Sequence, residues 1–347
     1  MAMKEMINSA IDNGKVDALF HDGKMHWDDV LSAYFIKKTA EHYNKDVVVN
    51  FYRSRNIEMF LENHPNGIVA DLGGGRYDHH GADAIEFYSN GIQYAACGKV
   101  LRDVPEEVIS EEIKEELLKD CLYYVQQSDN GKEAMIKYSN DYRLLQKLGA
   151  NEDLLQNFCK EVEFDPEKDM VQEGQYSDYL GSSLDAFNCT ESEGGIYCKQ
   201  QDANFEKAVE MATFLIDELL LKEKEKLDGV KAVKKVIKEQ HGPVLTLPRF
   251  ISGWQETVIA ENNTREDNDK VKFVIFPSGS QYRVSTVPIE NGSKFFVKGL
   301  KESLRGKEKE VINNDLGIED AVFVHNTGFI GGTVSYESAV KMAKASL

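Results

Sequence analysis

The sequence predicts an α/β protein with a mainly parallel sheet covered by helices on both faces, followed by a smaller C-terminal α+β domain. Strand-like and helix-like segments alternate over residues 16–126, which is typical of βαβ units. The last third instead contains several strand-like segments and one closing helix, and a long helical pattern separates the two regions. These three observations together favour two domains joined by a helix.

The N-terminal region contains three apolar segments of strand length and three segments with helical spacing of apolar residues. The predicted strands are 16–21, 46–52 and 67–71, and the predicted helices are 26–42, 91–100 and 107–126. Ligands of parallel sheets gather at the carboxyl ends of the strands. His21 and Asp71 each stand at the end of a predicted strand, so we expect them to lie close together.

The remaining segments complete the predicted organisation. Residues 131–200 carry polar loops, aromatic residues and Gly-rich pieces, so irregular structure is expected there, whereas 203–239 has a helical pattern. The strands predicted after it are 244–247, 271–276, 281–287 and 321–325, with a hairpin turn at 277–280 and a final helix at 335–345. We therefore predict a catalytic domain at 1–202, a linking helical segment at 203–240 and a substrate-binding domain at 241–347.

Composition limits the protein class. The 347 residues are 41% hydrophobic, which allows a large core. No run of 18 apolar residues and no apolar signal segment is present, so we expect neither a membrane span nor secretion. The five cysteines include no Cys-x-x-Cys pair and favour a reduced, cytoplasmic chain over a disulfide framework. The sequence is compatible with a homo-oligomer.

The charge distribution bears on the partner. The formal net charge is −18, which disfavours a general nucleic-acid coat. Residues 270–309, however, contain nine Lys or Arg against three Glu. This distribution favours a phosphate-bearing substrate of short length, held in one cleft.

Four of the eight histidines lie in two short motifs that also contain Asp. In the first, His21 ends a strand, and His26 and Asp28 open a helix after a Gly-containing turn. This arrangement lets three side chains converge. Histidine nitrogen together with carboxylate oxygen suits manganese, iron or zinc, and carboxylate-rich sites favour manganese or magnesium.

The second motif runs from Asp71 to His80. Three glycines follow Asp71 and allow close backbone approach, and the chain then delivers the Asp78-His79-His80 triplet. Asp129 follows another predicted helix and offers one more carboxylate. Helix capping, a plain turn and a plain loop are the alternatives for the single residues, but two compact His/Asp clusters at strand ends favour a metal site. The Gly-rich stretch lacks the Gly-Lys-Ser/Thr ending of a phosphate-binding P-loop.

In these motifs the chain resembles the DHH phosphoesterase superfamily, and more specifically its melanocyte-proliferating-gene protein branch of metal-dependent hydrolases. The resemblance rests on an ordered set of motifs across most of the chain. They are His21-x4-His26-x-Asp28, Asp71-x-Gly73-Gly74, Tyr77-Asp78-His79-His80, Asp129-Asn130-Gly131, Tyr282-Arg283-Val284, Val287-Pro288, Leu304-Arg305-Gly306 and the stretch Phe323 to Gly332. The sequence departs from the branch at Asp29, where Glu is common, and at Asp22 and Lys24. Thr333 follows the glycine pair where the superfamily often has His.

The resemblance implies a larger parallel DHH-type domain with two divalent metal ions, Mn²⁺ or alternatively Mg²⁺, and a smaller domain that closes over the cleft. It implies these metal ligands: His21, His26 and Asp71 for one ion, and Asp28, Asp71, His79 and Asp129 for the other. Asp71 would bridge the ions. His80 would face the phosphate and Asp78 would orient a ligand histidine, so these two are the expected catalytic pair.

The C-terminal domain offers candidates for phosphate contact. They are Arg283, Arg305, His325, Gly331 and Gly332, because guanidinium groups bind phosphate in bidentate fashion and glycines expose backbone amides. Surface salt bridges and a strand-to-helix turn are the alternative interpretations.

The leading hypothesis is a metal-dependent phosphoesterase that hydrolyses a phosphodiester with a hydroxide activated by two metals. The resemblance suggests a 3′-to-5′ exonuclease acting on short RNA or nucleotides. The alternatives are a pyrophosphatase or small-metabolite phosphatase, and a non-catalytic metal- or nucleotide-binding protein.

Overall fold

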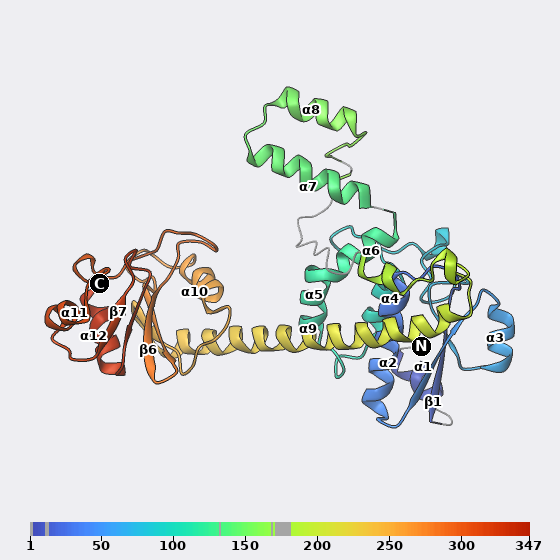
Figure 1. Cartoon of the computed structure of the whole chain (residues 1–347), viewed down its shortest axis with the longest axis horizontal. Helices are drawn as coiled ribbons and strands as arrows, with labels where there is room; N and C mark the ends of the chain where they lie inside the picture. Colours follow the sequence, from blue (N-terminus) through green and yellow to red (C-terminus); the bar gives the residue numbers. More distant parts are fainter. Residues whose placement is uncertain (1–2, 11–13, 132, 168, 171–181) are drawn as a thin grey trace. The chain divides into compact units, whose positions relative to one another are not determined.

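The computed structural model describes residues 3–10, 14–131, 133–167, 169–170 and 182–347. The chain divides into two compact units, Met1–Leu221 and Lys222–Leu347. They are called the first and second unit below, and each is described by itself (Figure 1).

The first unit contains a three-stranded parallel sheet. Its strands are β1 (Lys15–Phe20), β2 (Val48–Arg53) and β3 (Ile68–Val69), in the order β2-β1-β3. Central strand β1 is almost entirely buried, as expected for a parallel sheet covered on its faces. The mixed α/β class and the parallel pairing are confirmed, although the sheet is small and β3 has only two residues.

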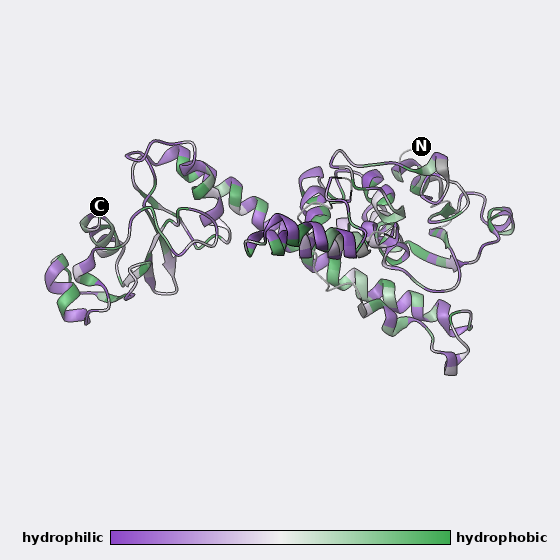
Figure 2. Cartoon of the chain, turned by 90° about the horizontal axis from the view of Figure 1, so that it is seen from above, coloured by the Kyte–Doolittle hydropathy of each residue, from purple (hydrophilic) through white to green (hydrophobic). Residues whose placement is uncertain are grey.

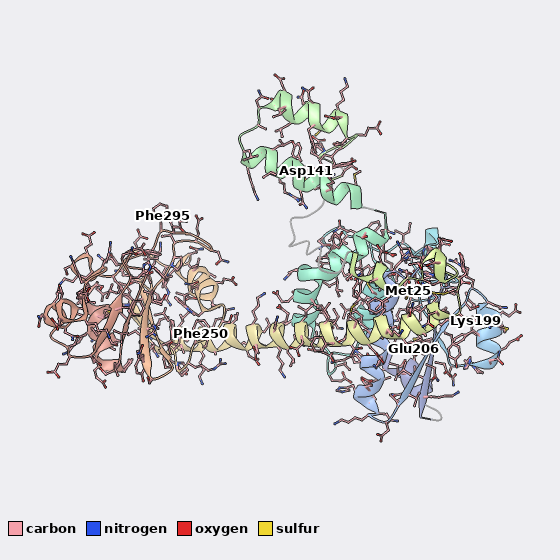
Figure 3. The ribbon with its side chains drawn as sticks, in the orientation of Figure 1. Met25, Asp141, Lys199, Glu206, Phe250 and Phe295 are labelled. Carbon is pink, nitrogen blue, oxygen red and sulfur yellow. A yellow bond between two sulfur atoms is a disulfide. The ribbon has the colours of Figure 1, made fainter. Side chains whose placement is uncertain are left out.

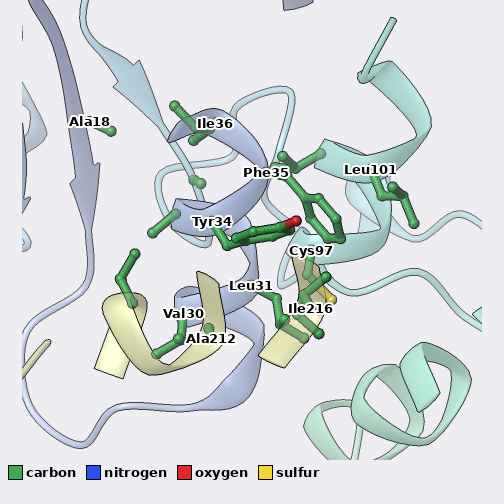
Figure 4. Close-up of a cluster of buried hydrophobic side chains, with 14 of the residues drawn as sticks. Ala18, Val30, Leu31, Tyr34, Phe35, Ile36, Cys97, Leu101, Ala212 and Ile216 are labelled. Atoms are coloured by element: carbon green, nitrogen blue, oxygen red, sulfur yellow. The ribbon is translucent and has the colours of Figure 1, made fainter. Parts of the chain in front are cut away.

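Helical elements precede and follow these strands in the chain. They are α1 (Met3–Ala10), α2 (Trp27–Tyr43), α3 (Ile57–Asn63), α4 (Ala96–Asp103), α5 (Glu111–Leu117), the π-helical η2 (Leu118–Leu122), α6 (Tyr123–Asp129) and the 3₁₀ turn η1 (Ala82–Ala84). Helix α2 is buried on most of its circumference. Figure 4 shows Tyr34 and Phe35 of α2 in one cluster with Leu101 of α4 and Ile216 of a later helix.

Two predictions for this unit need correction. The predicted helix at 91–100 begins only at Ala96, because Ala95 is extended and Phe87 pairs with Gln93 in an antiparallel bridge. The stretch 131–200, predicted as irregular, contains α7 (Glu133–Lys147) and α8 (Glu152–Glu161). These helices pack through aromatic rings on one face of each, a sparse pattern that the many charged residues obscured.

The same stretch also contains two 3₁₀ turns, η3 (Ser182–Phe187) and η4 (Glu191–Glu193). The part of it from 171 to 181 lies outside the described residues.

Helix α9 (Gln200–Glu239) is 40 residues long and spans the division between the units. Its N-terminal part buries Phe205, Val209 and Ile216 in the core of the first unit, at helical spacing. Its C-terminal part buries Val233 and Ile237 in the second unit. Hydrophobic and hydrophilic residues are therefore interspersed along the helix, as the hydropathy colours of Figure 2 indicate.

The second unit contains a mixed five-stranded sheet with the order β4-β5-β6-β8-β7. Its strands are β4 (Val244–Thr246), β5 (Phe273–Ser278), β6 (Gln281–Thr286), β7 (Ala321–Val324) and β8 (Ile330–Thr333). Only β4 and β5 pair in parallel, and the other pairs are antiparallel. The predicted hairpin joins β5 to β6 through Gly279, whose φ of +62° favours glycine.

Successive side chains of β5 point to opposite faces of the sheet and so contribute to two separate hydrophobic cores. Val274 and Phe276 contact one core with Trp254, whereas Phe273 and Ile275 contact the other. Helical elements α10 (Trp254–Asn262), η5 (Glu302–Leu304), α11 (Lys309–Leu316) and α12 (Tyr336–Ala345) complete the unit. Within the part of the chain that is described, none of the helices combines the length and apolarity that a membrane crossing requires.

Candidate metal centre

His21 is the first residue after β1, and its ring is fixed by its own loop. The Nδ1 atom donates to the carbonyl oxygen of Asp22 at 2.7 Å. The Nε2 atom is therefore directed to Asp29 Oδ2 at 3.0 Å and Asp71 Oδ2 at 3.4 Å. Burial lowers the pKa of His21, but Asp29 and Asp71 outweigh it and raise the pKa to about 9. A histidine whose Nδ1 is bound in this way presents Nε2 as a metal ligand.

His26 caps the N-terminus of α2 in an extended conformation. Its ring lies 5.4 Å from that of His21, centroid to centroid, and its Nδ1 is 3.6 Å from Asp129 Oδ1. Asp29, in the first turn of α2, accepts the backbone N–H of His26 at 3.1 Å and is fully buried. The helix start thus brings a second histidine and a carboxylate to His21.

Asp28 is fully buried and points away from its own helix to the start of α4. Its carboxylate accepts the backbone N–H of Ala96 at 2.9 Å and of Cys97 at 2.7 Å. Free N–H groups at a helix N-terminus stabilise an anion there. Burial, followed by the nearby Asp129 charge, nevertheless raises the pKa of Asp28 to about 7.

Asp71 has a left-handed backbone, with φ of +61°, which is unusual for a residue other than glycine. Such strain persists only where the surroundings enforce it, and it clusters at functional sites. Its two carboxylate oxygens face different histidines: Oδ2 faces His21, and Oδ1 is 3.0 Å from His79 Nε2. Burial, opposed by His79 and reinforced by neighbouring aspartates, raises the pKa of Asp71 to about 9.

His79 is buried between carboxylates. Its Nε2 lies 3.0 Å from both Asp71 Oδ1 and Asp129 Oδ2, and 3.8 Å from Asp28 Oδ2. Its Nδ1 is 3.1 Å from Asn130 Oδ1 and donates to it. Burial lowers the pKa of His79, but the contacts with Asp129 and Asp71 raise it to about 11.

Asp78 holds His80. Its Oδ1 accepts the ring Nδ1 of His80 at 2.8 Å and the backbone N–H at 3.1 Å, while Oδ2 accepts the N–H of Gly74 at 2.6 Å. Asp78 therefore orients His80, whereas the partner of His79 is Asn130. The His80 side chain is 61% exposed, and its Nδ1 lies 3.5 Å from Asp71 Oδ1.

The buried donor atoms fit divalent cations. Asp71 Oδ1, His79 Nε2 and Asp29 Oδ1 are buried without a hydrogen-bond partner among the described residues, although the first two lie 3.0 Å apart. Atoms that converge without hydrogen-bond geometry are arranged like ligands around a shared ion. Within the described part of the chain, three groups have ligand atoms within 4.8 Å of one another: His21, His26 and Asp29; Asp28, Asp71, His79 and Asp129; and Asp71, His79 and His80.

The implied ligand sets can now be compared with the geometry. All six predicted metal ligands lie in these groups, and Asp28, Asp71, His79 and Asp129 lie together as the resemblance implied. The group of His21 and His26 contains Asp29 in place of Asp71. Sequence reasoning missed Asp29 and Asn130, although adjacent acidic residues at 28–29 and the Asp-Asn-Gly triplet were signals that could have indicated them.

In the second unit, Arg283 and the glycine pair lie together. Gly331 and Gly332 belong to β8, not to a turn, and Gly332 pairs with Arg283 of β6. The Arg283 guanidinium stacks 5.5 Å from the centre of the Phe323 ring, and a Cβ on Gly332 would lie 2.9 Å from its Nη1. A side chain at 332 would therefore displace this arginine.

Arg305 has a structural role of its own. Its Nε donates to the carbonyl oxygen of Leu300 at 2.7 Å, and a Cβ on Gly328 would lie 2.5 Å from that Nε. His325 is exposed and its Nδ1 accepts the backbone N–H of Thr327 at 3.2 Å. Of these candidates, Arg305 is thus already engaged through its Nε with the backbone of Leu300.

A segment distant in sequence supports the turn between His21 and His26. The Asn188 Oδ1 accepts the N–H of Met25 at 2.8 Å, and Gln201 Nε2 donates to the carbonyl oxygen of Gly23 at 3.0 Å. Between these two residues in the sequence, the sulfur atoms of Cys189 and Cys198 meet. Met25 and Lys199 mark the two segments in Figure 3.

Comparisons with known proteins agree with one another. Residues 18–347 match the model MYG1_exonuc, described as "Uncharacterised protein family (UPF0160)". The chain is 25% identical to a MYG1 protein of Dictyostelium discoideum over 346 residues, covering 94% of this chain and 95% of that protein. It is 24% identical to a MYG1 exonuclease of Rattus norvegicus, covering 94% and 83%. A MYG1 protein of Saccharomyces cerevisiae is 36% identical over 110 residues, 31% of this chain and 32% of that protein.

Proposed function

We propose that this chain, which belongs to the MYG1 family described as UPF0160, is a metal-dependent phosphodiesterase that acts as an exonuclease on short RNA or nucleotides. Relatives that align over nearly the whole chain carry the name MYG1 exonuclease, at 24% identity. A nuclease-like function is therefore the starting point. The mechanism and the substrate are the parts that we add.

One observation carries the proposal: four ligand groups from three separate segments converge around a buried point. They are Asp28, Asp71, His79 and Asp129. Three carboxylates and one histidine make a site of hard and borderline donors that favours Mn²⁺ or Mg²⁺. The same set supports membership in the DHH phosphoesterase superfamily, in which the Asp78-His79-His80 triplet is the naming motif.

The chain's own residues suit this chemistry. His21, His26 and Asp29 would hold one cation and the four-residue group the other, with the two oxygens of Asp71 facing both sets. Bound divalent cations supply Lewis acidity and lower the pKa of water to near neutrality. They also keep the surrounding carboxylates deprotonated, although burial raises the pKa of Asp28 and Asp71.

His80 is the group we place against the substrate. Its ring is tied to Asp78 through Nδ1, which leaves Nε2 on a side chain that is 61% exposed. When protonated, this nitrogen donates a hydrogen bond to a phosphate oxygen or a proton to the leaving group. Asp78 is then a positioning residue, because its carboxylate binds His80 and Gly74 and acts on the substrate only through His80.

The test is nucleotide release from an oligoribonucleotide by the purified full chain with Mn²⁺. We expect mononucleotides to accumulate from the 3′ end, and Asp71→Asn to abolish the release. Asp22→Asn is the matched control, because this neighbouring carboxylate pairs with Arg55 at 2.9 Å on the surface. Release that survives Asp71→Asn contradicts the mechanism. Hydrolysis of pyrophosphate or small phosphate esters with intact oligonucleotides would instead favour the phosphatase alternative.

A further inference from the structure

A pocket separate from the proposed ligands lies beside the Asp-His-His segment. It has a volume of about 430 Å³, in the range of small-ligand sites. We call it the arginine pocket, and the residues that matter here are Gly74, Gly75, Arg76, Glu86, Lys99 and Arg102. Gly81 also lines the pocket and directly follows His80, so pocket and candidate metal centre share one chain segment.

Two arginines of the pocket are oriented by one carboxylate. Asp103 accepts the Nε of Arg76 through Oδ2 and the Nε of Arg102 through Oδ1, the latter at 3.2 Å. The Asp103 side chain is only 8% exposed, whereas those of Arg76 and Arg102 are 41% and 36% exposed. A guanidinium held by Nε retains N–H donors for a second planar anion. Asp103 therefore fixes both guanidinium groups at the pocket. The Nη1 of Arg102 also donates to Glu86 Oε2 at 2.5 Å, so Arg76 supplies more of the N–H donors that remain for a ligand.

A buried cation forms another part of the pocket wall. Lys99 is 1% exposed, and its Nζ donates to the carbonyl oxygens of Asp78 at 2.8 Å and Ala84 at 2.6 Å. It also pairs with Glu86 Oε1 at 3.1 Å. The three ammonium donors are thus used within the protein, so Lys99 contributes positive charge and rigidity and no direct ligand contact. Its bond to Asp78 connects the wall to the residue that holds His80.

The glycine residues 74 and 75 leave space on their side of the pocket. A Cβ at Gly74 or Gly75 would meet nothing within 4 Å, so the backbone there borders free space. Gly74 also donates its N–H to Asp78 Oδ2 at 2.6 Å, and that carboxylate binds His80. A ligand in the pocket would therefore lie against the same loop that positions His80.

We propose that the arginine pocket binds the phosphate of a nucleotide unit adjacent to the phosphodiester that is cleaved. Arg76 and Arg102 contact the phosphate, and Asp83, an exposed carboxylate of the lining, accepts a ribose hydroxyl. The volume, together with the Asp83 carboxylate as an acceptor for a sugar hydroxyl, favours a nucleotide over a free phosphate ion. The place of this unit in the substrate depends on the proposed function, but the binding itself does not.

The binding test uses the metal-free full chain with adenosine 5′-monophosphate as the probe, measured by calorimetry in EDTA. We expect saturable binding of the monophosphate and none of adenosine. Arg76→Gln and Arg102→Gln should each weaken the affinity at least tenfold. Arg55→Gln is the matched control, because Arg55 pairs with Asp22 outside the pocket, and circular dichroism verifies that each variant folds. Equal binding of adenosine and its monophosphate, or affinity unchanged in both pocket variants, overturns the proposal.

A second experiment distinguishes a failure of this proposal from a failure of the proposed function. With Mn²⁺ and an oligoribonucleotide, Arg76→Gln should raise KM about tenfold and change kcat little, because the pocket binds a unit that does not react. If the wild-type chain cleaves nothing but still binds the monophosphate through Arg76, the exonuclease function fails and the pocket stands. If cleavage occurs and neither KM nor monophosphate binding responds to the two arginines, the pocket fails and the function stands.

Discussion

Replacing Asn130 with Ala should weaken metal binding without removing any ligand. Asn130 Oδ1 accepts the Nδ1–H of His79 at 3.1 Å, and its Nδ2 donates to the Gln126 carbonyl oxygen at 2.8 Å, which fixes the amide. Loss of such an outer partner typically lowers metal affinity by about 10- to 100-fold. That corresponds to about 1.4–2.8 kcal/mol of binding free energy.

The assay is a Mn²⁺ titration of the full chain, followed by calorimetry or by competition with a fluorescent chelator. Asn63→Ala is the matched control, because Asn63 donates to a helix carbonyl, that of Met59, and has no histidine partner. Asn130→Asp keeps the acceptor for His79 but loses the Nδ2 donor to the Gln126 carbonyl oxygen, so its affinity should fall between those of the wild type and Asn130→Ala. A Mn²⁺ affinity of Asn130→Ala within twofold of the wild type, in a folded protein, would refute the argument that Asn130 orients His79.

Three further predictions follow from the first unit. Phe205→Ala should lower its free energy of unfolding by about 3–5 kcal/mol in urea denaturation, because this 1% exposed ring packs at 5.3 Å from Phe20 and 6.0 Å from Phe51; a loss below 1 kcal/mol would contradict the packing. Burial raises the pKa of Asp17, but hydrogen bonds from Asn50 and His64 hold it below its ordinary 3.8, so Asp17 stabilises the fold above that pH and the effect disappears as the pH falls through the folded pKa. The difference in unfolding free energy between wild type and Asp17→Asn, measured by urea denaturation, should therefore shrink as the pH falls from 6 to 3. A difference that grows over this range would contradict the lowered pKa of Asp17. Removal of metal with EDTA should lower the melting temperature, because a cation bound only by the folded set Asp28, Asp71, His79 and Asp129 stabilises the folded state, and Mn²⁺ should restore it; identical melting curves would argue against a bound ion.

Part of the fold could be predicted because its patterns are local. The apolar run before His21 and the β-branched run at 46–52 gave strands close to their observed positions in β1 and β2. Helices α7 and α8 were missed because few aromatic side chains, such as Tyr138 and Phe158, hold them together among many charged residues. Strand β8 was missed because its glycines weaken the strand signal. Position 332 requires glycine because a Cβ there would collide with the Arg283 side chain on the paired strand.

The site shows the same limit. The order of His and Asp residues indicated the buried cluster, because strand ends and helix starts meet at one edge of a parallel sheet. The choice between Asp28 and Asp29 depends on where α4 lies, since its N–H groups turn Asp28 away from His26 and leave Asp29 beside His21. The partner of Asp78 likewise follows from the left-handed backbone at Asp71 and the loop after it. Tertiary placement of this kind leaves no mark in a single sequence.

The most direct test of the metal centre is anomalous diffraction from crystals of the full chain grown with Mn²⁺. We predict one anomalous peak among Asp28, Asp71, His79 and Asp129, and a second beside His21, His26 and Asp29. Crystals that show manganese only elsewhere, or none at these residues at saturating Mn²⁺, would contradict the account.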